Sequence, residues 1–216
     1  MKELLFISVV ILVFMISGCS VEKPKTKAVY MLLDTSGTYT KELDKAQKII
    51  NYLLATLNSG DSLAVARIDS GSFSEKDIVS KVTFDIRPSV VSEQKRSFKR
   101  GIDNFVSGVK GSPYTDITGG VLQATEFLNE TQADEKIILV FSDLKEDLVK
   151  GHVRDFSIPL VDIQVVALNV TKLRSDNVDP RHYLNRVSKW QERINQGGGT
   201  WSVLNDLERL DRLIAG

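Results

Sequence analysis

The chain has 216 residues, 42% of them hydrophobic and 26% charged, a composition that suits one large globular domain or two small ones. Its 28 lysines and arginines equal its 28 aspartates and glutamates, so the formal net charge is zero. This balance argues against a protein that binds nucleic acid through overall positive charge, and we expect no nucleic-acid partner.

The first twenty residues are typical of a secretory signal rather than of a folded domain. Lys2 precedes thirteen apolar or small residues, Leu4 to Ile16, a stretch too short for a comfortable membrane span. Cys19 follows soon after, and as the only cysteine it excludes an intramolecular disulfide. The run I-S-G-C at 16–19 resembles the lipobox of bacterial lipoproteins. The resemblance implies a signal peptide over 1–18 and a lipidated, palmitate-bearing Cys19 as the first mature residue.

Two alternatives remain open for this segment: a signal peptide cut elsewhere, or an uncleaved anchor with an incidental cysteine. Residues 19–27 would form the lipidated cysteine and a polar linker. Fully extended, the eight residues 20–27 reach only about 28 Å, so the following domain should sit close to the membrane. Ser20 occupies the position where many inner-membrane lipoproteins have aspartate. We therefore expect a lipid-anchored protein of the bacterial cell envelope, in the outer membrane if the cell has one.

The remainder, 28–216, alternates between apolar runs and amphipathic segments. The spacing of Tyr39, Leu43, Ala46, Ile50, Leu53 and Leu57 places them on one helix face. In chain order the pattern predicts strand 28–34, helix 39–57, strands 61–68 and 77–86, helices 91–109 and 117–130, strands 136–143 and 160–170, a helix from Pro180 to the glycines 197–199, strand 200–204, and a last helix over 205–216 that Asn205 caps.

Fully apolar strands separated by helices predict an α/β fold. We expect a doubly wound, mostly parallel central sheet flanked by helices on both faces. In such sheets ligands bind in the crevice beyond the carboxyl ends of the strands. Asp34 and Asp143 each end a predicted strand, so both should lie on this functional rim.

The residues around the two aspartates suit a divalent cation. Mg²⁺ prefers hard oxygen ligands, and hydroxyl groups can supply them without adding charge. Ser36 and Thr38 follow Asp34 directly, and Gly37 between them would let the loop bend. Thr115, just before a predicted helix, is a candidate on a third loop.

These residues carry a family resemblance. D-T-S-G-T at 34–38 resembles the D-x-S-x-S motif of von Willebrand factor A (vWA) domains, Y-T-D-I-T-G-G-V-L-Q-A resembles their threonine loop, and I-I-L-V-F-S-D their later strand with its aspartate. The resemblance covers about 27–214 and implies a Rossmann-like fold with a metal-ion-dependent adhesion site. Carried over by position, the ligands of Mg²⁺ or Mn²⁺ are Asp34, Ser36, Thr38, Thr115 and Asp143. Thr38 departs from the usual serine, and Leu144 stands where many members have glycine.

The family implies adhesion or assembly rather than catalysis. We therefore expect a membrane-anchored lipoprotein that binds a partner protein, whose acidic residue completes the coordination of the metal. We expect no enzymatic activity and no small-molecule substrate. The metal rim should point away from the membrane, because the tether joins the opposite end of the first strand.

The principal alternative is phosphoryl transfer. D-T-S-G-T-Y-T also resembles the D-K-T-G-T-x-T loop of P-type ATPases and other haloacid dehalogenase-like proteins, in which the first aspartate, here Asp34, is the nucleophile. Asp143 and Asp147 could imitate the later acidic pair of that group. Thr35 replaces its lysine, however, and Ser36 replaces the aspartate that its phosphatases use as general acid. A structural alternative is that Asp34 and Asp143 simply cap the helices that follow them.

Overall fold

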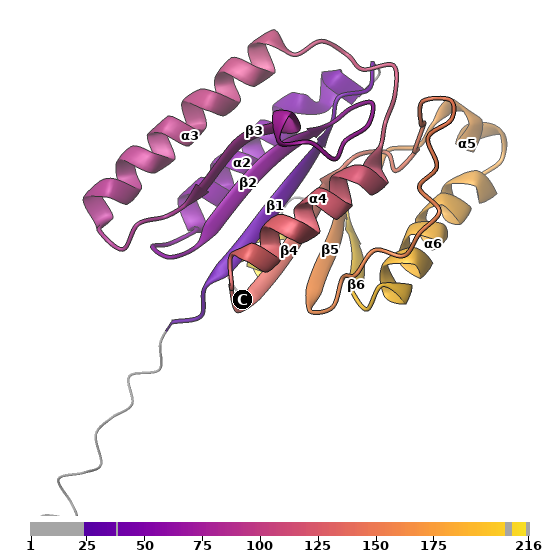
Figure 1. The fold of residues 1–216 in the computed structure, drawn as a ribbon. Coiled ribbons are helices and arrows are strands. Elements are labelled where there is room, and N and C mark those ends of the chain that lie inside the picture. Colours follow the sequence, from indigo (N-terminus) through magenta and orange to yellow (C-terminus); the bar gives the residue numbers. More distant parts are fainter. Residues whose placement is uncertain (1–23, 38, 206–208, 215–216) are drawn as a thin grey trace, which may run out of the picture.

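Six strands form one sheet in the computed structural model, which describes residues 24–37, 39–205 and 209–214 (Figure 1). Neighbouring strands follow the order β3-β2-β1-β4-β5-β6, and every pair is parallel except β2 with β3. The strands are β1 Lys27–Asp34, β2 Ser62–Ile68, β3 Ile78–Thr83, β4 Glu135–Phe141, β5 Ile163–Leu168 and β6 Thr200–Leu204. The prediction of a mostly parallel α/β sheet is confirmed.

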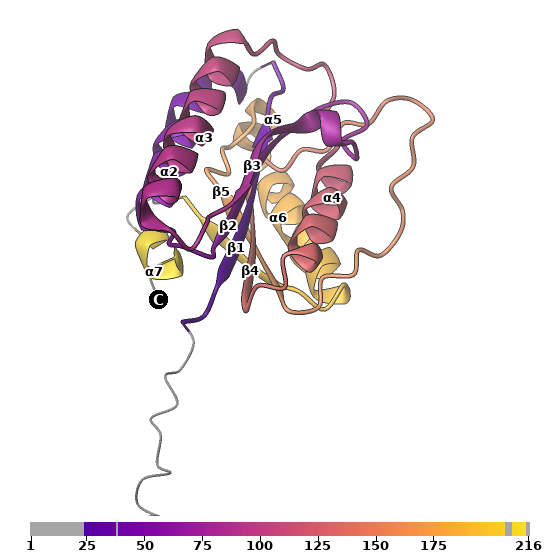
Figure 2. The ribbon, with the colours of Figure 1, turned by 60° about the vertical axis from the view of Figure 1, so that its left-hand side comes forward.

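Helices cover both faces of this sheet. Figure 2 shows α2, α3 and α7 on one side and α4 and α6 on the other, which confirms the doubly wound arrangement. The α-helices are α2 Leu43–Thr56, α3 Pro88–Gly108, α4 Ile117–Glu130, α5 Arg174–Val178, α6 Arg181–Gln196 and α7 Leu210–Ile214, and the 3-10 helices are η1 Tyr39–Glu42 and η2 Glu75–Asp77.

Strand β1 shows why the central strands are apolar without alternation. Val29, Met31 and Leu33 pack into the core beneath α2 and α3, whereas Tyr30 and Leu32 pack into the core beneath α4 and α6. All five side chains are 0% exposed. A parallel strand buried on both faces needs apolar residues at successive positions.

Several element boundaries differ from the sequence prediction. The helix expected from Tyr39 begins as a 3-10 turn and becomes α-helical at Leu43, and α5 was not predicted. Asn205 was expected to cap the last helix. Residues 206–208, which such a cap would contact, lie outside the described residues; Asn205 Oδ1 accepts a hydrogen bond from Val170 N at 2.8 Å, which ties the end of β6 to the end of β5.

The strand order places a topological switch point between β1 and β4. The chain leaves β1 toward β2 and β3, then crosses to β4 on the other side of β1. In sheets of this topology the ligand site lies beyond the carboxyl ends of the strands at the switch point, here β1 and β4. We call the region between these two strand ends the crevice. Among the described residues no helix is both long and apolar enough to cross a bilayer. The predicted signal peptide over 1–18 and Cys19 lie outside the described residues.

Candidate metal centre

Four of the five predicted metal ligands lie on segments that meet at this crevice. Asp34 ends β1, Ser36 follows it, Thr115 directly precedes the first turn of α4, and Asp143 lies just beyond β4. Thr38 lies outside the described residues.

Strand pairing brings the two aspartates together. Leu33 of β1 is the register partner of Phe141 of β4, so the strands end side by side. Just past these ends, Ser142 Oγ donates a 2.6 Å hydrogen bond to Asp34 Oδ2. Asp143 directly follows Ser142, the residue whose hydroxyl group contacts Asp34, so the two aspartates lie close together.

Both carboxylates are buried, with exposed fractions of 1% for Asp34 and 6% for Asp143. Asp34 Oδ1 accepts from Ser36 N at 2.8 Å, and Asp143 Oδ1 accepts from Lys145 N at 2.8 Å. Each carboxylate thus stabilises the turn that directly follows it.

The alternative in which these aspartates cap helices is wrong. Helix α2 begins at Leu43, well beyond the Asp34 turn, and its N-cap position is Glu42. The described segment 144–162, which follows Asp143, contains no helix.

Neither buried carboxylate, that of Asp34 or that of Asp143, forms an ion pair within the described residues. Burial raises the pKa of the Asp143 carboxyl, and the nearby charge of Asp34 raises it further. The charges of Arg186 and Lys145 act on Asp143 from a longer distance and lower its pKa, but the net shift is upward. The pKa of Tyr39 is raised chiefly by burial and also by both aspartates. The site is therefore a pair of buried carboxyl groups with no ion pair of their own among the described residues.

The loop after β1 contacts the loop that leads to α4. Ser36 and Ser112 form a parallel bridge, and Ser112 N donates to Thr35 O at 2.7 Å. The two loops approach closely at Gly111, where a Cβ would lie in a tight contact 3.0 Å from Gly37 Cα.

Gly37 lies in a turn, as expected. Tyr39 N and Thr40 N both donate to Ser36 O, and the turn forms without a left-handed conformation at the glycine.

Thr115 is joined to the segment that follows Asp143. Thr115 N donates to Asp147 O at 2.8 Å, and Asp147 N donates to Thr115 O at 3.0 Å. This antiparallel bridge links two of the three predicted ligand loops directly. Asp147 thus has a structural role here that its place in the sequence did not reveal.

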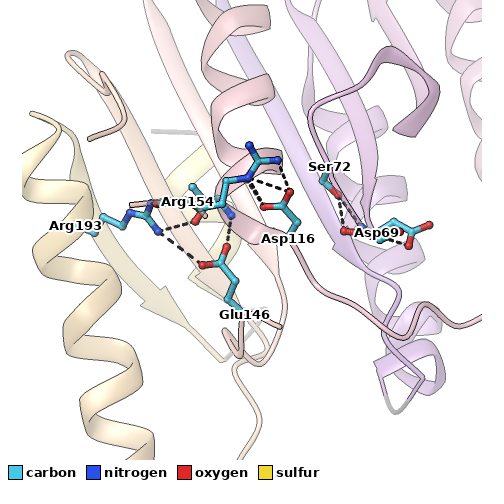
Figure 3. Close-up of polar contacts among 9 residues, drawn as sticks. Asp69, Ser72, Asp116, Glu146, Arg154 and Arg193 are labelled. Carbon is cyan, nitrogen blue, oxygen red and sulfur yellow. Dashed lines mark hydrogen bonds and ion pairs between the residues drawn. The ribbon is translucent and has the colours of Figure 1, made fainter. Parts of the chain in front are cut away.

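The residue that follows Thr115 forms an ion pair: Figure 3 shows Arg154 against Asp116. Asp116 is 1% exposed and caps α4, because its Oδ1 accepts from Gly119 N at 2.8 Å. Its Oδ2 lies 2.7 Å from Arg154 Nη2. The carboxylate next to Thr115 is therefore neutralised, unlike those of Asp34 and Asp143.

Helix α6 extends this network. Glu146 Oε1 accepts from Thr118 N at 2.7 Å, and Arg193 Nη1 donates to Thr118 Oγ1 at 2.6 Å. Arg193 Nη2 also donates to the carbonyl oxygen of Arg154 (Figure 3). Charged residues far apart in sequence thereby hold the start of α4.

The loop after β2 packs on the same helix start. Asp116 N donates to Asp69 O at 3.2 Å, and Figure 3 shows Ser72 beside Asp69 and near Asp116. A Cβ on Gly119 would lie 2.0 Å from Ser72 O, so this position admits only glycine.

The loop after Asp143 adopts a conformation that favours glycine, although it carries Leu144. The φ angle of Leu144 is +65° and its side chain is 1% exposed. Arg186 Nε donates to Asp143 O at 2.8 Å, and Trp190 Nε1 donates to Leu144 O at 3.1 Å. Sequence reasoning missed Arg186, since no local pattern relates it to Asp143.

The described residues fit a hard divalent cation. Buried charges in proteins are normally paired or bound to metals, and Asp34 and Asp143 are unpaired. Ser36 and Thr115 add hydroxyl groups of the kind that Mg²⁺ accepts. No cluster of three or more His, Cys, Asp or Glu side chains suited to a metal occurs among the described residues. Hydroxyl groups would therefore have to complete the ligand set.

Known structures share this fold. A von Willebrand factor type A protein from Catenulispora acidiphila is 13% identical over 88% of this chain and 41% of its own, with a TM-score of 0.52. A mutant of the PilB minor pilin from Streptococcus sanguinis is 11% identical over 91% of this chain and 61% of its own, with a TM-score of 0.54. The pilus adhesin SpaC from Lactobacillus rhamnosus GG is 8% identical over 90% of this chain and 30% of its own, with a TM-score of 0.51.

These likenesses establish a vWA-type fold, as the sequence motifs predicted. This chain spans less than two thirds of the length of each of the three proteins. No protein-family model and no curated protein sequence matches it.

Proposed function

We propose that this chain is a lipid-anchored vWA protein of the bacterial envelope that binds a partner protein through Mg²⁺ or Mn²⁺. The observation that carries the proposal is the pair of buried carboxylates, Asp34 and Asp143, which lie at adjacent strand ends and form no ion pair within the described residues. A cation would neutralise this pair, and a carboxylate of the partner would complete its coordination.

The proposed ligands divide by charge. Asp34 and Asp143 would supply negative charge, mainly through bound water, because their oxygens already accept hydrogen bonds from the protein. Ser36, Thr38 and Thr115 would be direct hydroxyl ligands. A site with only two carboxylates leaves positive charge on the ion, which favours an acidic ligand from outside.

The arrangement of β1 supports an outward-facing site. Lys27 and Asp34 are the first and last residues of β1, a strand that runs from one end of the sheet toward the other (Figure 1). Seven steps of about 3.3 Å separate the two ends by roughly 23 Å. An anchor at Cys19 would therefore hold the far pole and present the metal centre to soluble or opposing partners.

Adhesion rather than catalysis is the proposed activity. A pilus adhesin and a minor pilin share the fold, which is consistent with a protein-binding role at the cell surface. The phosphoryl-transfer alternative has no supporting observation. Asp34, its nucleophile, is 1% exposed and accepts hydrogen bonds on both carboxylate oxygens.

Manganese binding tests the proposal. A soluble protein beginning at Ser20 would be titrated with Mn²⁺ and followed by electron paramagnetic resonance, beside Asp34→Ala and Asp143→Ala. We expect saturable binding that both variants lose. The control is Asp155→Ala, which removes an exposed carboxylate outside the crevice and should bind as the parent does. Equal binding by the parent and Asp34→Ala would contradict the proposal.

A further inference from the structure

We infer that Arg186 of α6 is a positioning residue for the metal centre: by holding the backbone at Asp143 and Leu144, it sets where the Asp143 carboxylate points. This inference rests on the proposed cation site and deepens it. The evidence is a chain of contacts that runs from α6 through Leu144 to both carboxylates.

Leu144 occupies an unfavourable backbone conformation. Four non-glycine residues in the described chain have positive φ, at Gln132, Leu144, Asp162 and Asn169. Asparagine and aspartate tolerate the left-handed region, but a buried branched apolar residue rarely adopts it. Leu144 therefore needs surrounding contacts to keep its conformation, and such positions cluster at functional sites.

Helix α6 supplies those contacts. Arg186 Nε donates to the carbonyl oxygen of Asp143, and Trp190 Nε1 donates to that of Leu144. The two donors are four residues apart, on one face of the helix. They hold the carbonyl groups on both sides of the Leu144 backbone torsions, so the direction of the Asp143 side chain depends on α6.

Arg186 is itself immobilised by a buried ion pair. Its Nη1 and Nη2 donate to the two carboxylate oxygens of Asp176 at 3.2 and 2.8 Å. The side chain of Arg186 is 12% exposed and that of Asp176 is 0% exposed. A guanidinium can bind a carboxylate with two nitrogens and still offer a third, which lysine cannot do.

The same contacts reach Asp34. Leu144 N donates to Ser142 Oγ at 3.0 Å, and Ser142 Oγ donates to Asp34 Oδ2 at 2.6 Å. A shift of the Leu144 backbone would therefore disturb both carboxylates. Outer residues that orient metal ligands typically change metal affinity by about 10- to 100-fold when removed.

The test uses the full chain in detergent micelles. The principal variant is Arg186→Met with Asp176→Leu, which removes the contact to Asp143 without leaving a buried unpaired charge. A second variant is Arg186→Lys, which keeps the charge but loses the forked geometry. The matched control is Arg181→Met: it lies on the same helix, pairs with Asp179 and is 82% exposed.

Two readouts are needed. The first is Mn²⁺ affinity by electron paramagnetic resonance, for which we expect about 10- to 100-fold weakening in the double variant and no change in the control. The second is amide hydrogen exchange of residues 142–146 without metal, which should become faster only in the variants of Arg186. The melting temperature reports whether the fold is intact.

The outcomes separate this inference from the proposed function. If the parent does not bind Mn²⁺, the proposed function fails, and exchange at 142–146 alone decides whether Arg186 holds this loop. If the parent binds Mn²⁺ and the double variant matches it within twofold, the positioning role is overturned. If the double variant does not fold, the same two measurements on Arg186→Lys decide, with weakening of about tenfold expected.

Discussion

Asp34 and Asp143 end neighbouring strands, but different parts of the molecule hold them. Asp34 is the last residue of β1. Its carboxylate accepts hydrogen bonds from Ser36 N and Ser142 Oγ, which lie just beyond the ends of the two central strands, β1 and β4. Asp143 begins a long irregular segment, and its carbonyl group is bonded to Arg186, 43 residues later. One carboxylate is placed by the sheet and the other by a helix that packs beside it.

The difference shows that a site built from short sequence motifs can still depend on contacts between residues far apart in the chain. The pairing of β1 with β2 and β4 positions Asp34 and the turn that follows it (the Asp34 edge of the site) once the sheet has formed. The Asp143 edge also requires α5, α6 and the ionic contacts between them. Changes in those helices should therefore affect the two edges unequally.

The largest effect is expected at the buried ion pair. Arg186→Met leaves Asp176 buried without a partner, which should lower the free energy of unfolding by about 3–5 kcal/mol. Arg181→Met breaks an exposed pair that solvent screens, so it should leave the urea midpoint nearly unchanged. Urea unfolding measures both. Similar losses of stability in the two variants would contradict the idea that the buried pair of Arg186 with Asp176 stabilises the fold more than an exposed ion pair on the same helix.

A smaller effect is expected from glycine substitution. Gly119→Ala places a Cβ against the backbone oxygen of Ser72 and should destabilise the protein by about 1–3 kcal/mol. Gly37→Ala, on the Asp34 edge, meets no atom within 4 Å and should change stability by less than about 0.5 kcal/mol. Thermal unfolding measures the loss of stability in both variants. A larger loss for Gly37→Ala than for Gly119→Ala would contradict this prediction.

Removing one rim charge should stabilise the metal-free protein. Asp143→Asn deletes a buried carboxylate whose pKa burial raises, and we expect a gain of about 1 kcal/mol at neutral pH together with loss of Mn²⁺ binding. Asp155→Asn, at an exposed position, is the control and should change neither quantity. Destabilisation by Asp143→Asn in the absence of metal would argue that the crevice tolerates both charges.

Two aspartates should respond to pH with opposite signs. The Arg186 guanidinium lowers the pKa of Asp176 from 3.8 to about 2, so this pair stabilises the fold above about pH 4 and loses its effect as the pH falls through about 2. The pKa of Asp143 is raised, so its contribution is present at low pH and is lost as the pH rises through the raised value.

Urea midpoints measured without metal as a function of pH would test these signs. The Arg186→Met, Asp176→Leu variant should not show the loss of stability as the pH falls. The Asp143→Asn variant should not show the loss of stability as the pH rises through the raised pKa of Asp143. Parallel profiles for the parent and both variants would contradict the assignment.

The smallest effect is expected from the tether. Adding about twenty Gly and Ser residues within 20–27 should leave Mn²⁺ affinity unchanged within twofold, because the anchor would lie at the pole opposite both carboxylates. The measurement is the same titration on liposome-bound protein. A large loss would mean that the membrane surface takes part in the site.

Much of the fold was predictable because its signals are local. Every strand was expected within a few residues, and α4 has the predicted bounds, Ile117–Glu130. The antiparallel direction of β3 and the short helix α5 were not predicted. Both depend on packing against distant elements rather than on the periodicity of their own residues.

The sequence by itself determined that Asp34 and Asp143 follow apolar strands and that Thr115 precedes a helix, because apolar periodicity and turn residues act over a few positions. Only the tertiary structure decided that β1 and β4 are neighbours at the switch point, that Thr115 is bridged to Asp147, and that α6 holds Leu144 in a left-handed conformation. These contacts join residues far apart along the chain, and they form only when both faces of the sheet are packed.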